Sequence, residues 1–419
     1  MYSRTYFGPY STASNKKIYY VGNKIFKPIE NIKKLKILER KTKDLFSPFG
    51  KKYFSSIQSI GNTIFISAVE YFRSLGAEFV MLPIVTKMIS SPGAALKEIL
   101  IGEKSKISSI ETIPMTLDWF GFKNKVFLSE SSQLYLELTL VLNKRLKHVF
   151  SIYNSFRKEC ADQTHLCEFH HIEYEGKVTQ KENQKIIRDL ILYIIKKLLE
   201  KNDRELAQFL NKDDIRKLET LSKQDFIEIT LANLLERLYE DTKDKSYLEF
   251  SSLNFGWWEE VRITELEGKM VFVKEFPIDE VPFYQAVKEP SGEENYVEIK
   301  IKNKTIKAKV VKGKIVANNA DLIATGYREI VGSGHRVRSQ GECIWQLENL
   351  LRKNMKLPEK QIKMIMEWYA PYIFAREEDT YKETSGFGLG VERFMQWILK
   401  TPTIVDVTLY PRLHFSISP

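Results

Sequence analysis

The 419-residue sequence has few cysteines and no long apolar segment. Its three cysteines, Cys160, Cys167 and Cys343, are too few and too unevenly spaced for a disulfide framework, which favours a reducing compartment. No apolar run approaches the roughly 20 residues that a membrane span requires, and the first ten residues lack the pattern of a secretory signal. We therefore expect a soluble, cytoplasmic protein.

The charge balance is basic, with 64 Lys and Arg residues against 54 Asp and Glu residues and a formal net charge of +10. Basic and acidic residues alternate along the whole chain, which is typical of a solvated surface. Excess positive charge attracts polyanions but does not select among them. Composition therefore leaves nucleic-acid binding open, while a hydrophobic content of 43% predicts a folded core.

Hydrophobic periodicity predicts the main elements. Strand-like alternation at 149–156 and 169–175 predicts a long antiparallel hairpin. Apolar residues at helical spacing predict helices within 60–75, 187–199 and 341–375. Further stretches predict a short strand at 79–82, a strand-rich hairpin at 291–315, and a glycine turn that opens into a helix at 386–398.

The predicted hairpin carries the first cluster of polar residues. Phe169, His171, Glu173 and Glu175 share one face of a strand, and Arg157 at the end of the partner strand faces the same space. A guanidinium group opposite carboxylates and an aromatic ring suits a nucleotide. A surface hairpin with cross-strand ion pairs has the same pattern, so the residues alone leave both interpretations open.

A second cluster contains two acids separated by a short turn, Asp321 and Glu329. Such a pair suits Mg²⁺, which takes one or two carboxylates together with substrate phosphates. Gly332 and Gly334 permit a close backbone approach to a ligand, and Arg336 adds a fixed fork for a carboxylate or an amide. A tight turn with a satisfied ion pair is the alternative.

A third cluster is the glycine-rich stretch 385–394, in which Arg393 falls about one turn inside the predicted helix. From there it can reach a phosphate near the glycines, although the spacing matches neither the dinucleotide nor the Walker pattern. Five possible zinc ligands also lie close in sequence, but zinc sites usually pair ligands two to four residues apart and add a second pair elsewhere, so zinc is disfavoured. These residues are Cys160, His165, Cys167, His170 and His171.

In this order, the three clusters resemble motif 2, the acidic segment and motif 3 of the catalytic domain of class II aminoacyl-tRNA synthetases. The resemblance extends to 76–83, which is similar to motif 1 with its interface proline, and to 131–135, 282–284 and 409–412. It implies an α+β fold in which an antiparallel β-sheet is flanked by helices, and a homodimer formed through motif 1 around Pro83. We expect a basic extension at 1–52 and a catalytic domain at 53–419, with a helical segment at 176–265.

The resemblance further implies an AMP-forming ligase that uses ATP and Mg²⁺. Such an enzyme needs no protein nucleophile, because the substrate carboxylate attacks the α-phosphorus and catalysis depends on positioning and charge neutralisation, here by Arg157 and Arg393. The implied ATP ligands are Arg157 for the α-phosphate, Glu159 and Phe169 for adenine, and His165 and Arg393 for the outer phosphates. Asp321 and Glu329 are the implied Mg²⁺ ligands. The expected amino-acid ligands are Ser131, Gln133, Glu137, Arg336, Gly386 and Gly388.

The residues after Gln133 indicate which amino acid is bound. In aspartyl enzymes this run carries a lysine for the substrate carboxylate, whereas here Leu136 and Glu137 stand there, as in asparaginyl enzymes. Glu137 can accept a hydrogen bond from a side-chain amide, and it would repel an aspartate carboxylate about 4 Å away by about 4 kcal/mol at an effective dielectric of 20. The resemblance is therefore to the asparaginyl branch.

Some features depart from this family pattern. About 60 residues before motif 1 are too few for the usual anticodon-binding barrel, so an N-terminal anticodon-binding domain is not expected. Residues 89–94 lack the acidic Glu-Gly pair that commonly binds the α-amino group. Residues 163–164 replace an Arg pair, and 382–384 replace a Pro-His pair.

Four functions follow, in order of preference. The first is a stand-alone paralogue that adenylates asparagine or a close analogue and transfers the acyl group to an acceptor. The second is an unusual asparagine–tRNA ligase in which the basic extension or a partner protein supplies tRNA contacts. The third is synthesis of asparagine from aspartate and ammonia, and the fourth is a sensor or regulatory paralogue without catalysis.

Overall fold

The computed structural model describes most of the chain, and the statements below concern that part of it. The described residues are 8–11, 17–21, 24–26, 46–102, 113–121, 126–159, 161, 163–221, 223–288, 295–301, 304–310, 315–377, 383–401 and 403–417.

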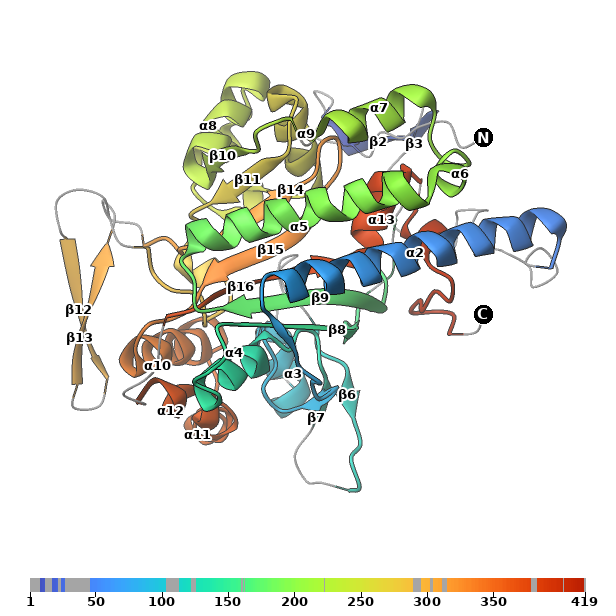
Figure 1. Ribbon diagram of the computed structural model, residues 1–419. Helices are drawn as coiled ribbons and strands as arrows, with labels where there is room; N and C mark the ends of the chain where they lie inside the picture. The colour runs from blue at the N-terminus through green and yellow to red at the C-terminus, as the bar shows by residue number, and fades with distance from the viewer. Residues whose placement is uncertain are drawn as a thin grey trace.

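An eight-stranded sheet forms the centre of the molecule (Figure 1). Its outermost neighbours pair in parallel, β10 with β11 and β4 with β8, and all other neighbours pair antiparallel. The predicted hairpin is confirmed as β8 and β9, which pair without interruption from His148 opposite Gly176 to Phe156 opposite Glu168. In spatial order, the strands are β10 (Ile227–Thr230), β11 (Val271–Lys274), β14 (Ala320–Ile323), β15 (Glu329–His335), β16 (Ser385–Gly390), β9 (Glu168–Gly176), β8 (His148–Phe156) and β4 (Glu78–Phe79).

Two long helices, α2 (Pro48–Ser74) and α5 (Gln180–Lys201), lie side by side across one face of this sheet (Figure 1). The helix predicted at 60–75 is the C-terminal part of α2, which begins upstream because the Ser47 side chain caps its N-terminus and a proline occupies the first turn. A capping box formed by Thr179 and Glu182 begins α5. Residues close in sequence therefore determine where both helices begin.

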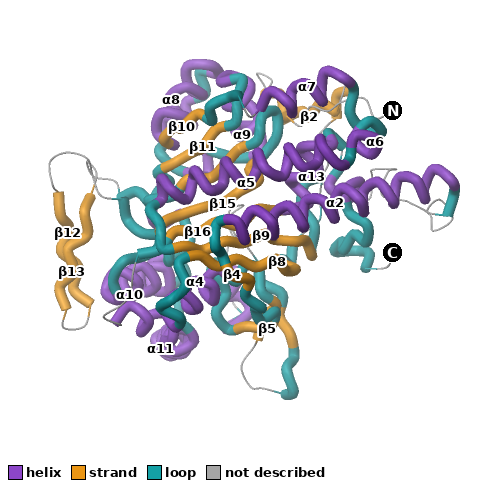
Figure 2. Tube along the Cα trace, viewed as in Figure 1, coloured by secondary structure: helices purple, strands orange, loops and turns teal. Residues whose placement is uncertain are grey.

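A second layer of helices covers the opposite side of the sheet (Figure 2). It contains α4 (Gln133–Leu142), α10 (Gln340–Asn349), the π-helical turn η6 (Leu350–Asn354), α11 (Glu359–Trp368) and α12 (Ala370–Phe374). The helical pattern predicted at 341–375 is thus confirmed. Its apolar residues form a separate cluster that includes Leu134, Phe283 and Tyr369, and the site described below lies between this cluster and the sheet.

The remaining elements complete the fold. A hairpin of β12 and β13 extends from the left side in Figure 1, where the sequence predicted a strand-rich hairpin. The short strand predicted at 79–82 is observed only as β4. The other strands are β1 (Gly8–Ser11), β2 (Lys17–Val21), β3 (Lys24–Phe26), β5 (Val85–Thr86), β6 (Thr116–Leu117), β7 (Val126–Leu128), β12 (Asn295–Ile301) and β13 (Lys304–Val310). The other helices are α3 (Ala94–Ile101), α6 (Asp203–Leu206), α7 (Lys212–Leu221), α8 (Leu231–Thr242), α9 (Trp257–Glu267), α13 (Val391–Leu399), η3 (Lys245–Leu248), η4 (Ser252–Asn254), η5 (Ile278–Glu280), η7 (Ala375–Glu377) and η8 (Ile404–Val407).

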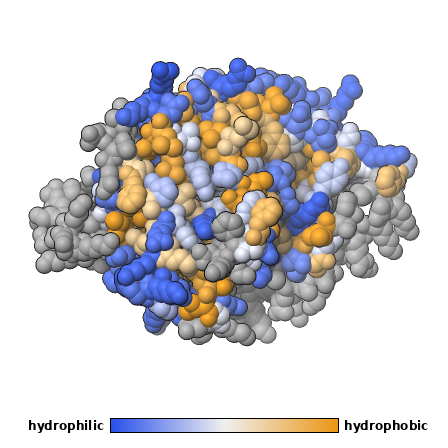
Figure 3. Space-filling view, turned by 90° about the horizontal axis from the view of Figure 1, so that it is seen from below, coloured by the Kyte–Doolittle hydropathy of each residue, from blue (hydrophilic) through white to orange (hydrophobic). Residues whose placement is uncertain are grey.

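Hydrophobic character is divided between core and surface in the usual way. Seen from below, apolar patches alternate with polar ones across the face that Figure 3 shows. Among the helices of the described residues, none combines the length and apolar content needed to cross a bilayer.

Phe72 on α2 packs this helix against the sheet. Its ring is fully buried, and it stacks on Phe150 of β8 at a centroid distance of 4.7 Å and on Tyr174 of β9 at 5.7 Å. Aromatic contacts of this kind add to the free energy of burying the ring. The β8–β9 hairpin, which carries much of the site, is therefore supported from behind by α2.

We predict that Phe72→Ala lowers the free energy of unfolding by about 3–5 kcal/mol, because it opens a cavity that neighbouring rings cannot fill. Urea titration followed by circular dichroism measures the change. Ile66→Ala on the same helix is the control, because Ile66 is 46% exposed and its truncation should cost less than about 0.5 kcal/mol. Equal losses for the two variants would contradict this account of the core.

Candidate active site

The end of the β8–β9 hairpin places Arg157 beside an aromatic ring. The Arg157 guanidinium carbon lies 5.2 Å from the centroid of Phe169, and the Arg157 N–H donates to the Cys167 carbonyl over 2.9 Å. Arg157 Nε is buried and has no hydrogen-bond partner among the described residues. Glu159 lies two residues further on, half-buried. A buried donor without an acceptor marks a place where an anionic ligand fits.

Arg393 joins three parts of the chain that are distant in sequence. It lies in the first turn of α13, and its guanidinium donates to the carbonyls of Thr164 and Glu329, both over 3.3 Å. A third contact, 2.9 Å long, joins Arg393 Nη2 to His165 Nε2. Burial, together with the charges of Arg157 and Arg393, lowers the pKa of His171 to about 3. Both guanidinium groups thus contribute positive potential to the same face of the sheet.

The two acids of the second cluster lie close together, as predicted. A methyl group at Gly332 would lie 3.1 Å from Glu329 Oε1 and 3.8 Å from Asp321 Oδ1. Burial and the neighbouring Glu329 charge raise the pKa of Asp321 well above its ordinary value. Two acids that lie this close together suit a divalent cation that keeps other oxygen ligands. In the described part of the chain, no group of three or more His, Cys, Asp and Glu side chains has the arrangement of a metal site.

The residues named as possible zinc ligands have other partners where they are described. His170 Nδ1 lies 2.6 Å from Glu392 Oε1, and His171 Nδ1 lies 2.7 Å from Ser155 Oγ. Cys167 Sγ donates to the Glu159 carbonyl, while Cys160 lies outside the described residues. These contacts give no support to a shared metal.

The N-terminal end of α4 supplies polar groups to the opposite side of the site. Ser131 Oγ donates to Glu173 Oε1 over 2.6 Å, and Gln133 Oε1 accepts from the Tyr284 hydroxyl over 3.4 Å. Burial raises the pKa of Glu173 to about 7. Gly388 on β16 faces Glu173, with 3.4 Å available between a methyl group there and Glu173 Oε1. Predicted amino-acid ligands from two segments, Ser131 before α4 and Gly388 on β16, therefore meet at Glu173.

Arg336 forms a buried ion pair with Glu175 at the centre of the sheet. Its Nε and Nη2 atoms donate to the Glu175 carboxylate over 2.7–3.1 Å, and the two side chains are 2% and 0% exposed. A methyl group at Gly386 would lie 1.9 Å from Glu175 Oε2 and 2.7 Å from Arg336 Nη2. The structure therefore places Gly386 where only a glycine leaves room for this pair.

Glu137, the residue on which the choice of amino acid depended, is also paired. Arg376 Nη2 donates to Glu137 Oε1 over 2.6 Å, and the Tyr372 hydroxyl donates to Oε2 over 2.5 Å. The Glu137 and Arg376 side chains are 2% and 0% exposed. Arg376 was not predicted, because it lies 239 positions away in sequence and no local pattern connects the two residues.

Glu130 is a second residue that the sequence patterns did not identify. It is 1% exposed, and its Oε1 accepts from Ser90 Oγ over 3.0 Å and from the Ser91 N–H over 2.5 Å. Burial raises the pKa of Glu130 to about 7, although the nearby Arg157 charge opposes this shift. Its position directly before Ser131 was a possible signal, but a single acid before a helix has many other uses.

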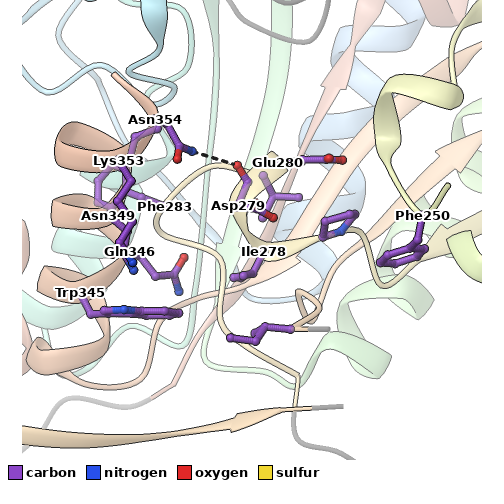
Figure 4. A pocket seen from close by; sticks show the side chains of 14 residues that line it. Phe250, Ile278, Asp279, Glu280, Phe283, Trp345, Gln346, Asn349, Lys353 and Asn354 are labelled. Atoms are coloured by element: carbon purple, nitrogen blue, oxygen red, sulfur yellow. Dashed lines mark hydrogen bonds between the residues drawn. The ribbon is translucent and has the colours of Figure 1, made fainter. Parts of the chain in front are cut away.

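A cavity of about 450 Å³ lies between η5 and the helices α10 and η6 (Figure 4). Trp345, Ile278 and Phe283 form apolar parts of its wall, and Gln346 lines it while donating to the Gln285 carbonyl over 2.8 Å. None of the site residues predicted from the sequence lines this cavity. This cavity is therefore distinct from the predicted site residues on the sheet face.

Comparison with known proteins agrees with this geometry. The asparagine–tRNA ligase of Thermoplasma acidophilum is 27% identical over 361 residues, which are 86% of this chain and 69% of that protein. The asparagine–tRNA ligase of Desulforamulus reducens is 30% identical over 306 residues, which are 72% of this chain and 60% of that protein. A crystal structure of asparaginyl-tRNA synthetase from Pyrococcus horikoshii, complexed with asparaginyl-adenylate, has a TM-score of 0.66 and 24% identity, and the match covers 90% of this chain and 71% of that one.

These similarities define a class II synthetase fold. The family described as tRNA synthetases class II (D, K and N) matches residues 64–414, and the chain belongs to this family of ligases. The α+β fold class and the resemblance to the asparaginyl branch, both predicted from the sequence, are confirmed.

We predict that Gly386→Ala destabilises the protein by about 3–5 kcal/mol, because the new methyl group must displace one partner of a buried ion pair. Gly388→Ala is the matched control on the same strand, because its methyl group meets Glu173 only at ordinary contact distance. Urea unfolding of the two variants measures the difference. A loss at Gly388 as large as that at Gly386 would show that the pair is not the cause.

We also predict a pH-dependent effect of Glu130→Gln. The folded protein holds a proton on Glu130 up to about pH 7, whereas an ordinary glutamate releases it near 4.5. Because the folded state then binds more protons than the unfolded state, this residue makes stability fall as pH rises from about 4.5 to 7. Glu130→Gln should match the wild type at pH 4.5 and exceed it by up to about 3 kcal/mol at pH 8.

Urea unfolding at the two pH values tests this prediction. Glu98→Gln makes the same chemical change at an exposed position and should alter stability little at either pH. A Glu130→Gln effect that is the same at pH 4.5 and pH 8 would show that the carboxyl is not held neutral by burial.

Proposed function

We propose that this protein adenylates asparagine, or a close analogue, with ATP and transfers the acyl group to an acceptor. The observation that carries the proposal is the arrangement around Arg393, which binds His165 and the Glu329 backbone while the unpartnered Nε of Arg157 lies on the same sheet face. Two segments distant in sequence, the end of the β8–β9 hairpin and α13, thus place the guanidinium groups of Arg157 and Arg393 around one space, beside two acids. Such a space fits a triphosphate whose charge must be neutralised.

The roles of the individual residues follow from this arrangement. Arg157 would bind the α-phosphate, Phe169 would stack on adenine with Glu159 at its edge, and His165 and Arg393 would hold the outer phosphates. An oxygen of the amino-acid carboxylate attacks the α-phosphorus, and the bond to the pyrophosphate leaving group breaks. The protein contributes by fixing these groups in line and by neutralising charge, since no side chain forms a covalent intermediate.

A magnesium ion fits the acidic pair. Asp321 and Glu329 are the residues that would hold it, because their carboxylates lie together, and burial and the Glu329 charge raise the pKa of Asp321 in the absence of a cation. A bound Mg²⁺ would supply positive charge to the phosphates. The family generally uses ATP and Mg²⁺, which supports this assignment.

Charge balance around the side-chain end of the site favours an amide over a carboxylate. Three acids, Glu137, Glu173 and Glu175, face two guanidinium groups, those of Arg336 and Arg376. When all are ionised, one negative charge remains in excess, so an additional substrate carboxylate is repelled. Glu137 alone would not repel a substrate carboxylate, because Arg376 already neutralises that residue.

The acceptor defines a second candidate function. The relatives described above are asparagine–tRNA ligases, so charging of tRNA is the alternative that a specific observation favours. The chain spans roughly two thirds of the length of those two proteins. Aspartate–ammonia ligation is disfavoured by the excess negative charge, and a purely regulatory role does not explain why the complete set of phosphate-binding side chains is present.

Assembly and location complete the proposal. We expect a homodimer through the motif 1 region near Pro83, because Phe79, Met81 and Ile84 are 52%, 90% and 46% exposed beside the edge strand β4. Exposed apolar side chains that gather beside a sheet edge are typical of a protein–protein interface. A cytoplasmic location remains the expectation from composition.

Amino-acid-dependent exchange of labelled pyrophosphate into ATP tests the proposed function. We predict exchange with asparagine, and a decrease of about 10²- to 10³-fold in kcat for Arg157→Ala, because charge stabilisation at the α-phosphate is lost. Lys158→Ala removes a neighbouring positive charge that is exposed and should retain most of the activity.

The same assay is repeated with and without total tRNA. Exchange with asparagine and no acylated tRNA would support a different acceptor, whereas stable acylation would favour the tRNA ligase. Exchange with aspartate alone would favour aspartate–ammonia ligation. Folded wild-type protein that exchanges with no amino acid would overturn the adenylation proposal.

A further inference from the structure

One oxygen of the Glu130 carboxyl group accepts hydrogen bonds from the protein, and the other has none among the described residues. Ser90 and Ser91 donate to Oε1, while Oε2 is buried and has no hydrogen-bond partner among the described residues. A carboxylate without water or a donor on one oxygen costs free energy unless a ligand supplies the missing charge. Glu137 and Glu175 each form an ion pair with a buried arginine. Among the described residues, Glu130 forms no such pair.

Glu130 lies near Arg157, the residue proposed to bind the α-phosphate. The Arg157 charge acts on Glu130 strongly enough to oppose the effect of burial on its pKa. Within the described part of the chain, however, the two side chains form no ion pair, and Arg157 Nε and Glu130 Oε2 are both unpartnered. A guanidinium group and a carboxyl group thus lie near each other, and each keeps an atom that no described residue pairs with.

We propose that Glu130 binds the α-ammonium group of the amino-acid substrate and so selects α-amino acids over acids that lack this group. The inference rests on the proposed adenylation. In an aminoacyl-adenylate, which is a mixed anhydride, only the carbonyl carbon and the α-carbon separate the bridging phosphate oxygen from the ammonium group. A phosphate held by Arg157 therefore places an ammonium group within a few ångströms, where the unpartnered oxygen of Glu130 accepts its hydrogen bond.

The other acids of the site are less suited to this position. Glu137 and Glu175 are each paired with a buried arginine. Glu173 also has an unpartnered oxygen, but the cation that acts on it is Arg336 rather than Arg157, which places it toward the side-chain end of the substrate. Glu130 is also the acid held by residues 90–91, inside the segment where the sequence lacks the expected acidic residue for the α-amino group.

Pyrophosphate exchange with two substrates tests the proposal. Asparagine carries the α-ammonium group, and succinamic acid is the same molecule without it. For the wild type, we expect a strong preference for asparagine. Glu130→Gln should raise the KM for asparagine roughly 10- to 100-fold, because an ion-paired hydrogen bond becomes a neutral one. The KM for succinamic acid should stay unchanged or fall, and kcat should change little.

Two further variants separate binding from a structural role. Glu130→Asp keeps the charge and should partly restore the preference for asparagine. Ser90→Ala removes one donor to Oε1 and leaves Oε2 and its charge in place, so it should preserve the ratio of the two KM values. Glu98→Gln, exposed on α3, is the control for an equal change of charge elsewhere.

The outcomes distinguish this inference from the proposed function. Equal losses with both substrates, or an unchanged preference in Glu130→Gln, would overturn the assignment of Glu130 while leaving adenylation in place. A wild-type protein that exchanges with neither asparagine nor any other amino acid would overturn the proposed adenylation, and the assignment of Glu130 with it. A selective loss for asparagine would establish Glu130 as the ammonium ligand.

Discussion

Burial of carboxylates on one face of the central sheet is the constraint on which the rest of the structure depends. Glu130, Glu173 and Glu175 each have a pKa raised to about 7 by burial, and Asp321 is shifted in the same direction. A folded protein accepts this cost only when other interactions are strong enough to hold the side chains in place. The opposite face supplies those interactions, because α2 and α5 cover it with an almost wholly apolar layer.

The two faces are linked through single strands. Tyr174 packs against Phe72 on the apolar side, while its neighbours Glu173 and Glu175 point into the site. Alternation along β9 therefore lets one strand contribute to the core and the site at once. The Arg336–Glu175 pair then joins the residue that follows β15 to β9, and Gly386 on the intervening β16 leaves the space that the pair occupies.

Sequence patterns predicted those features that depend on residues close together in the chain. The period-two alternation at 149–156 and 169–175 specified the β8–β9 hairpin, and resemblance to a known family indicated Arg157, Phe169 and Arg393. The structure shows that Arg393 contacts His165 and the Glu329 backbone, a meeting that resemblance implied but spacing could not show. The roles given to these residues remain predictions.

The missed features depend on contacts across long stretches of sequence. Arg376 neutralises Glu137, and Ser91 binds Glu130 from 39 positions away. Both contacts join segments distant in sequence, because residues 90–91 meet Glu130 just before α4 and residues 372–376 meet Glu137 within α4. No local pattern encodes such contacts, since each residue on its own is compatible with a surface position. The electrostatics of a site built from several segments therefore has to be derived from the folded structure.

The pairing of Glu137 with Arg376 also bears on the choice of substrate. From sequence, discrimination between an amide and a carboxylate depended on Glu137 as a lone charge. In the structure, Glu137 and Glu175 are each neutralised by an arginine, whereas Glu173 and Glu130 form no ion pair with an arginine among the described residues. An α-ammonium group bound at Glu130 would favour the ionised form of that carboxyl group, and Glu173, when ionised, would oppose a side-chain carboxylate. Selection for an amide is then a property of the whole set of charges rather than of one residue.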